Sequence, residues 1–109
     1  MAYDARLAER VRRLLARRKG IIEKMMFGGL AFLFRGRMFC GILNDDLVVR
    51  VGPQRYEKAL SRSHARPMDF TGRPFKGYVY VEPNGTKTKS MLARWVGAAI
   101  DFVSSLPRQ

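Results

Sequence analysis

Residues 30–43 read LAFLFRGRMFCGIL, two largely apolar runs on either side of the pair Gly36-Arg37. A Gly-X pair between apolar runs fits the two-residue type II′ turn of a β-hairpin, with Gly36 at the position of positive φ. In that register the ring of Phe32 lies opposite Gly41, where it meets no side chain. The stretch therefore predicts an antiparallel hairpin, and we expect the neighbouring elements to extend the same sheet.

The sequence around this hairpin predicts three helices and several further strands. The helices are expected over residues 4–18, over 53–60 with Pro53 at the first position, and from a cap at Thr88 to Pro107. The other strands are expected over residues 21–26, a short lead-in, and over 47–51, 65–70 and 75–82. In the order α-β-β-β-α-β-β-α this is an α+β fold, a two-layer arrangement of an antiparallel sheet of about five strands with helices on one face.

The length and composition of the chain fit one domain over residues 1–109. The hydrophobic fraction of 47% is high enough for a core of its own. No apolar run reaches the roughly 20 residues that a membrane span needs, and the first residues lack the plan of a secretory signal. The single cysteine, Cys40, cannot form an internal disulfide. We therefore expect a cytoplasmic protein that does not enter the membrane.

The charge balance is the strongest signal in the composition. Twenty-one Lys and Arg against nine Asp and Glu give a formal net charge of +12, and fifteen of the 21 cations are Arg. Such an excess favours acidic partners, whether nucleic acid, anionic lipid or acidic protein, without choosing among them. A general Arg bias of a GC-rich genome explains the same excess about equally well.

The first predicted helix carries a row of cations on the side that faces away from its apolar stripe. As a basic surface this row could follow nucleic-acid phosphates, whereas as a solvated helix face it needs no partner. No recognition-helix plan accompanies it, so sequence-specific reading of DNA is not expected. The candidate nucleic-acid residues are Arg6, Arg10, Arg13, Arg17, Arg18 and Lys19.

The hairpin is apolar on both faces, although the helices of a two-layer fold cover only one. Strict alternation places Leu30, Phe32, Phe34, Phe39 and Leu43 on one face and Ala31, Leu33, Met38, Cys40 and Ile42 on the other. An uncovered apolar face is typical of a partner surface, and self-association as a homodimer is the preferred interpretation. The stacking of nucleic-acid bases on tyrosines of this face is the alternative. The residues predicted to mark it are Arg50, Lys76, Tyr78 and Tyr80.

The residue types that carry catalysis are sparse. A Cys-His catalytic pair would need Cys40, His64 and an orienting group such as Asp69 within hydrogen-bond reach. Cys40 lies inside an apolar run, where a free thiol usually packs as a small hydrophobe. One His, one Cys and scattered carboxylates have no metal-ligand spacing. We expect no enzyme activity, no cofactor and no metal.

A turn rich in Thr and Gly follows the fifth expected strand. Asp69 and Arg73 flank Thr71-Gly72 and could pair across this turn. We interpret Asp69, Gly72 and Arg73 as a structural turn, with contact to a ligand as the alternative.

Three segments together carry a resemblance to a known family. They are MFGGLAF at 26–32, LVVRVG at 47–52 and HARPMDFTGRP at 64–74. They resemble the N-terminal domain of TfoX/Sxy competence regulators, here in a stand-alone version, and the likeness runs from about Arg6 to Leu106. The resemblance implies a two-layer fold with an antiparallel sheet, similar to type III secretion chaperones, and no known enzyme activity.

These observations lead to one expected function and one alternative. We expect a non-enzymatic binding or adaptor domain that acts through protein contacts, and the resemblance implies a place in the regulation of DNA uptake or transcription. The alternative is an auxiliary nucleic-acid-binding protein without sequence preference, which uses the basic first helix.

Overall fold

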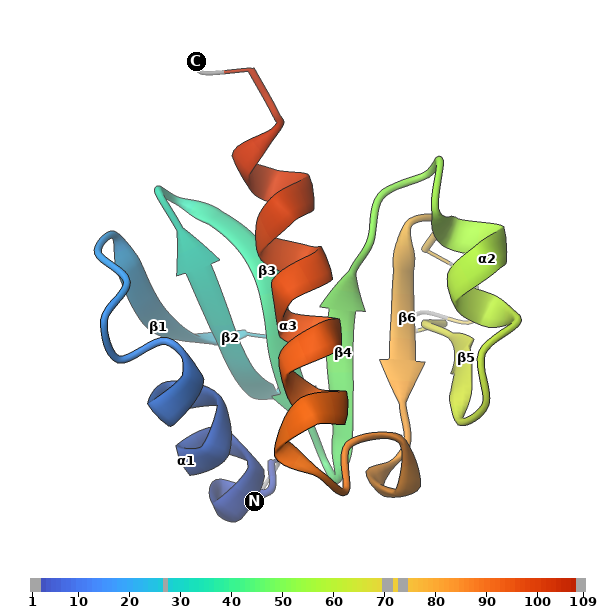
Figure 1. The fold of residues 1–109 in the computed structure, drawn as a ribbon, viewed down its shortest axis with the longest axis horizontal. Coiled ribbons are helices and arrows are strands. Elements are labelled where there is room, and N and C mark those ends of the chain that lie inside the picture. Colours follow the sequence, from blue (N-terminus) through green and yellow to red (C-terminus); the bar gives the residue numbers. More distant parts are fainter. Residues whose placement is uncertain (1–2, 27, 70–71, 73–74, 108–109) are drawn as a thin grey trace.

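A six-stranded antiparallel sheet runs through the molecule in the order β1-β2-β3-β4-β6-β5 (Figure 1). The computed structural model describes residues 3–26, 28–69, 72 and 75–107. The strands are β1 (Ile21–Met26), β2 (Gly29–Phe34), β3 (Arg37–Leu43), β4 (Asp46–Arg50), β5 (Ala65–Pro67) and β6 (Tyr78–Val81). The α+β class with an antiparallel sheet is confirmed. The segment expected as a short lead-in is a full strand, which brings the sheet to six strands.

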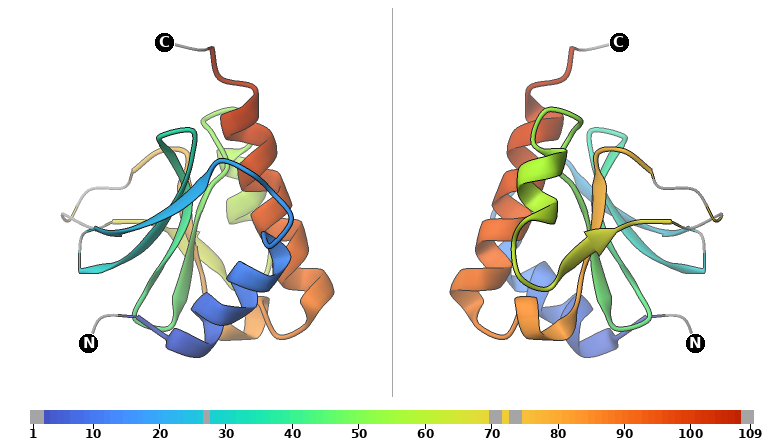
Figure 2. Two further views of the ribbon diagram at one scale, coloured as in Figure 1. Left: turned by 90° about the vertical axis from the view of Figure 1, so that its left-hand side faces the viewer. Right: turned by 90° about the vertical axis from the view of Figure 1, so that its right-hand side faces the viewer.

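Three α-helices accompany the sheet, and Figure 2 places them on one side of it. They are α1 (Ala5–Leu14), α2 (Tyr56–Leu60) and α3 (Lys89–Ser104), and a 3-10 turn, Pro83–Gly85, precedes α3. Asp4 caps α1 by accepting from the backbone N–H groups of Arg6 and Leu7, and Thr88 caps α3 by accepting from Met91. None of these helices, in the part of the chain that the structure describes, is long and apolar enough to cross a bilayer.

The core lies between α3 and the strands that it crosses. α3 buries side chains at the helical spacing of three and four residues, and β3, β4 and β6 bury alternate residues toward it. Each large apolar side chain removed from water contributes about 1.5–3 kcal/mol. From α3 the large side chains are Leu92, Trp95, Val96, Ile100 and Val103, and Ala99 is buried among them.

The central hairpin differs from its prediction by one residue in the turn. Phe34 stands opposite Arg37, so the two turn residues are Arg35 and Gly36, with φ of 53° and 83°. Two successive positive φ angles define a type I′ turn, whose twist matches that of the flanking strands. The predicted type II′ turn at Gly36-Arg37 is therefore wrong.

The shifted turn is accompanied by a β-bulge in β3. Phe32 pairs with Cys40 whereas Leu33 pairs with Met38, so Phe39 is an extra residue between them. Beyond the bulge the alternation is reversed relative to the prediction. Cys40 and Ile42 are buried on the helix side, and Leu43 packs on the opposite side.

The side of the sheet that faces away from the helices is called the outer face below. Its side chains come from β2, β3, β4 and β6 and from the segment around β5. They include Ala31, Leu33, Met38, Leu43, Val48, Arg50, Arg66, Met68, Tyr78 and Tyr80.

Candidate binding surfaces

The outer face has a small apolar layer of its own. Val48, Met68 and Tyr80 are buried there, and Met38, Leu43 and Tyr78 pack half-buried against them. The segment after β5 contributes because the backbone N–H of Phe75 donates to the carbonyl of Met68 at 2.7 Å. The Phe75 ring meets the Tyr78 ring edge-on, with centroids 6.1 Å apart. The face is therefore apolar, and Met68 is one of its buried residues.

One ion pair lies on the outer face above Tyr80. Arg66 Nη2 donates to Asp46 Oδ2 at 2.7 Å, and its guanidinium lies 4.6 Å from the centroid of the Tyr80 ring. The hydrogen bond to Asp46 raises the pKa of Arg66. Burial raises the pKa of Tyr80 because the phenolate would lose its hydration, and the charge of Asp69 adds to this.

Arg50 belongs to the edge of the outer face rather than to its centre. Its Nη1 donates to the carbonyl of Met38 at 3.2 Å. The guanidinium lies 5.5 Å from the Tyr78 ring and 5.3 Å from the Phe102 ring of α3. Of the residues predicted for this face, Tyr78 and Tyr80 share β6, Arg50 stands opposite Tyr78, and Lys76 is exposed in the turn before β6.

The cations of α1 divide into exposed and engaged residues. Arg6 and Arg13 are exposed. Arg10 Nη2 instead donates to the carbonyl of Thr86 at 2.5 Å and to that of Lys87 at 3.4 Å, which ties α1 to the start of α3. The predicted row of cations is therefore interrupted at Arg10.

Arg12, which was not predicted as important, anchors α1 to β1. Its Nε and Nη2 donate to both carboxylate oxygens of Glu23, at 2.7 and 2.8 Å, and its Nη1 donates to Glu9 at 3.3 Å. The hydrogen bond to Glu23 raises the pKa of Arg12, and the same bond lowers the pKa of Glu23. A bidentate ion pair of this kind constrains the relative orientation of the two side chains in addition to pairing their charges.

Cations from two separate segments gather at the end of the molecule where α1 leads into β1. α1 ends at Leu14, earlier than predicted, and Arg17, Arg18 and Lys19 follow it as exposed loop residues. The backbone N–H of Arg35 donates to the carbonyl of Gly20 at 3.1 Å, which brings the β2–β3 turn beside this loop (Figure 1). The cations that share this place are called the basic end; they are Arg17, Arg18, Lys19, Arg35 and Arg37.

The basic end is hollowed on both sides of Arg35. A hollow of about 500 Å³ is lined by Arg17, Arg18, Lys19 and Arg35 together with two apolar side chains. Arg37 lines a second hollow and donates to the carbonyl of Pro107. Among the described residues no carboxylate pairs with these cations. Arg35 and Arg37 were missed because the sequence places them far from Arg17, and only the β1–β2 pairing joins them.

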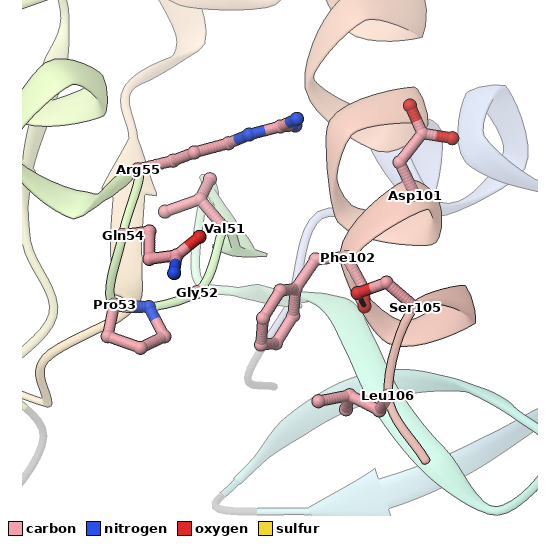
Figure 3. Close-up of a pocket in the computed structure, with 9 residues that line it drawn as sticks. All are labelled: Val51, Gly52, Pro53, Gln54, Arg55, Asp101, Phe102, Ser105 and Leu106. Carbon is pink, nitrogen blue, oxygen red and sulfur yellow. Dashed lines mark hydrogen bonds between the residues drawn. The ribbon is translucent and has the colours of Figure 1, made fainter. Parts of the chain in front are cut away.

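A third hollow, of about 480 Å³, lies between the loop after β4 and the C-terminal end of α3 (Figure 3). Its base is apolar, with Val51, Phe102 and Leu106, and Figure 3 shows Arg55 and Asp101 on opposite sides of its mouth. No sequence pattern indicated this hollow, because its walls come from segments about fifty residues apart.

The model of one family, the TfoX N-terminal domain, matches residues 13–103. The chain belongs to this family. The matched region begins within α1 and ends within α3, so it includes every strand of the sheet. A comparison with curated proteins found no match.

In this TfoX N-terminal domain the residues weighed for catalysis lie in different surroundings. Cys40 is fully buried on β3, and burial raises the pKa of its thiol. His64 is exposed, with a φ of 71°, before β5. The described residues hold no group of three His, Cys, Asp or Glu side chains close enough to bind a metal.

The predicted structural turn is described only in part. The backbone N–H of Gly72 donates to the carbonyl of Asp69 at 3.1 Å, and Gly72 has a φ of 82°. Arg73 lies outside the described residues, so its predicted pairing with Asp69 stays a prediction.

Proposed function

We propose that this TfoX N-terminal domain is a non-enzymatic binding domain that acts through protein contacts made by its outer face. The observation that carries the proposal is the half-buried group Met38, Leu43 and Tyr78 on the side of the sheet that faces away from the three described helices. Phe75 beside it has 39% of its surface exposed. Apolar side chains gathered on one face favour a protein partner. The family resemblance favours a role in the regulation of DNA uptake or transcription.

A second copy of the chain is the simplest partner for the outer face. A symmetric contact places the same patch against itself, and the apolar middle of this patch is self-complementary. Two of the charges around it are engaged, because Arg66 pairs with Asp46 and the Arg50 guanidinium lies close to the rings of Tyr78 and Phe102. The net charge of +12 opposes association, so the dimer should strengthen as salt is added.

Sedimentation equilibrium at micromolar concentration tests this proposal. We expect the wild type to dimerise and Met38→Glu to be monomeric, because a carboxylate in the apolar middle of the contact would lose its hydration on association. Ala93→Glu, on the exposed side of α3, is the matched control and should leave the dimer intact. A wild type that stays monomeric across the concentration series would reject the homodimer.

Nucleic-acid binding is the second candidate, and the basic end is the observation that favours it. Arg17, Arg18, Lys19 and Arg35 line one hollow, so they could contact neighbouring phosphates together. Contacts to phosphates carry no sequence information, so binding of this kind would be independent of sequence. The site that we propose for this second function is therefore the loop after α1 rather than the helix face.

Binding to unrelated duplexes and single strands across a salt series tests this candidate. We expect Arg17→Glu with Arg18→Glu to lower the slope of log affinity against log salt by about two units, one for each phosphate contact. The control, Arg6→Glu with Arg13→Glu, makes the same charge change on exposed residues of α1. Equal losses in both double variants would mean that only net charge matters, and negligible binding at low salt would remove the candidate.

A further inference from the structure

The strand β1 is the open edge of the sheet. Among the described residues it pairs with β2 alone. The bond from the Arg35 N–H to the Gly20 carbonyl sets the alternation of the ladder. Successive residues of a strand direct their backbone groups to opposite sides, so every second residue from Ile22 directs its N–H and C=O toward β2. Ile21, Glu23 and Met25 direct theirs toward the open edge.

The two edges of the sheet are not equally protected. The opposite edge, β5, has three residues and ends at Pro67, which has no N–H to donate. β1 has six residues, and Ile22 and Met25 expose 56% and 62% of their surface. These two side chains lie on opposite faces of the sheet, so a strand added beside β1 would cover part of both. An edge of this length with exposed apolar side chains is a template for pairing.

A second copy of this chain does not fit the edge well. Two antiparallel copies of β1 are related by a two-fold axis normal to the sheet, so each residue must face another from the same side of the sheet. In one of the two central registers Glu23 stands opposite Glu23 of the second copy, and in the other Lys24 stands opposite Lys24 of the second copy. Like charges directly opposite each other destabilise a strand pair.

The charge around β1 favours an acidic occupant instead. Glu23, the only acid of the strand, is already held by Arg12. Lys24 is exposed on the strand, and Arg18 and Lys19 are exposed just before it. A residue opposite Lys24 would share its face of the sheet, so an acidic side chain suits that position, and an apolar one suits the position opposite Met25.

We propose that the open edge of β1 binds an extended, acidic segment of a partner protein, which adds a strand to the sheet. Backbone hydrogen bonds to Ile21, Glu23 and Met25 supply the register, and Lys24 selects acidic side chains. This inference rests on the proposed function in that the domain acts through a protein partner, but it uses a different surface from the outer face.

The test uses a short dye-labelled peptide that alternates glutamate and valine, measured by fluorescence anisotropy against the intact domain. A peptide that alternates lysine and valine is the control. We expect saturable binding of the acidic peptide alone. Amide hydrogen exchange followed by NMR should then show new protection at Ile21, Glu23 and Met25, since the alternate amides are already bonded to β2.

Two variants separate pairing at the edge from simple charge attraction. Met25→Pro removes an outward N–H without touching a bond to β2, and it should weaken binding at least about tenfold relative to Met25→Ala. Lys24→Glu should weaken it as well, and thermal melting checks that each variant folds. Equal binding by Met25→Pro and Met25→Ala, or no saturable binding by the wild type, overturns the inference.

Two further variants distinguish peptide binding at the β1 edge from the dimer of the outer face and from binding at the basic end. Met38→Glu should lose the dimer of the outer face and keep the peptide. If the dimer forms as proposed and the peptide does not bind, the edge inference alone fails. If Arg17→Glu with Arg18→Glu abolishes peptide binding while Met25→Pro keeps it, the peptide occupies the basic end and the inference is wrong.

Discussion

Gly52 lies in the loop just after β4, close to the ring of Phe102. Its φ is +87°, and a Cβ on it would lie 2.3 Å from Cε1 of Phe102. Any side chain there would meet backbone strain and a clash at once. Gly36 has a similar φ of +83°, but nothing lies within 4 Å of the Cβ that it lacks. Comparing the same substitution at the two glycines therefore separates the free-energy cost of the positive φ angle from the cost of the contact with Phe102.

Gly52→Ala is expected to destabilise the domain more than Gly36→Ala. The backbone angle costs about 1–2 kcal/mol at either position. The contact with Phe102 should add about 1–3 kcal/mol at Gly52 alone. Urea unfolding of both variants gives the two free energies of unfolding. Equal losses would mean that the Phe102 ring moves aside without cost.

At the scale of elements, the pairing of α1 with β1 depends on Arg12 and Glu23. The pKa of Glu23 is lowered in the folded state, so its ion pair stabilises the domain above the unfolded carboxyl pKa of about 4.3. That contribution is lost as the pH falls through the lowered folded value. Because both side chains are partly exposed, solvent and salt screen the pair.

Glu23→Gln should therefore lower the free energy of unfolding by about 1 kcal/mol at neutral pH. The difference from wild type should shrink toward zero in acid, where the carboxyl is protonated in both states. Glu57→Gln, an exposed acid on α2, serves as the control and should change little at either pH. A Glu23→Gln deficit that stayed the same in acid would point to lost packing rather than to charge.

The strands and helices could be located from the sequence because their apolar periodicity is strong. The register of the hairpin could not, since Gly36 suits the first position of one turn type and the second position of another. The bulge at Phe39 is also invisible to an alternation rule, and it decides which face receives Cys40 and Ile42. The end of α1 was predicted too late because its cationic tail reads as favourable for a helix C-terminus.

At the scale of the whole molecule, the net charge of +12 was known from composition, but its distribution was not. Of the candidate cations, Arg10 is engaged with carbonyl groups, whereas Arg17, Arg18 and Lys19 meet Arg35 across the β1–β2 pairing. The sequence therefore identified the cations but not which of them are neighbours in space, and their binding of nucleic acid stays a prediction. Residues on different strands become neighbours only through the pairing of those strands, and a single sequence does not show which strands pair.

This concentration of like charge predicts that salt stabilises the fold. Between low and physiological ionic strength the screening length falls from about 30 Å to about 8 Å, which weakens repulsion across the basic end. We expect the melting temperature to rise over that range. Arg17→Glu with Arg18→Glu should melt with a smaller dependence on salt, because part of the repulsion is already removed. A melting temperature that falls as salt is added would show that ion pairs outweigh repulsion.

The described ends of the chain are held at opposite ends of one strand, β3. The backbone N–H of Asp4 donates to the carbonyl of Asn44, just past β3, and Arg37 at its start donates to Pro107. Seven residues of strand span roughly 23 Å, so a tether pulled at both ends would stretch the molecule along β3. The described ends lead into α1 and α3 rather than into strands, so force first loads these two single hydrogen bonds and the packing of the two helices. Single-molecule pulling should accordingly show the helices detaching at low force before the sheet ruptures, and one high rupture peak with no earlier event would contradict this geometry.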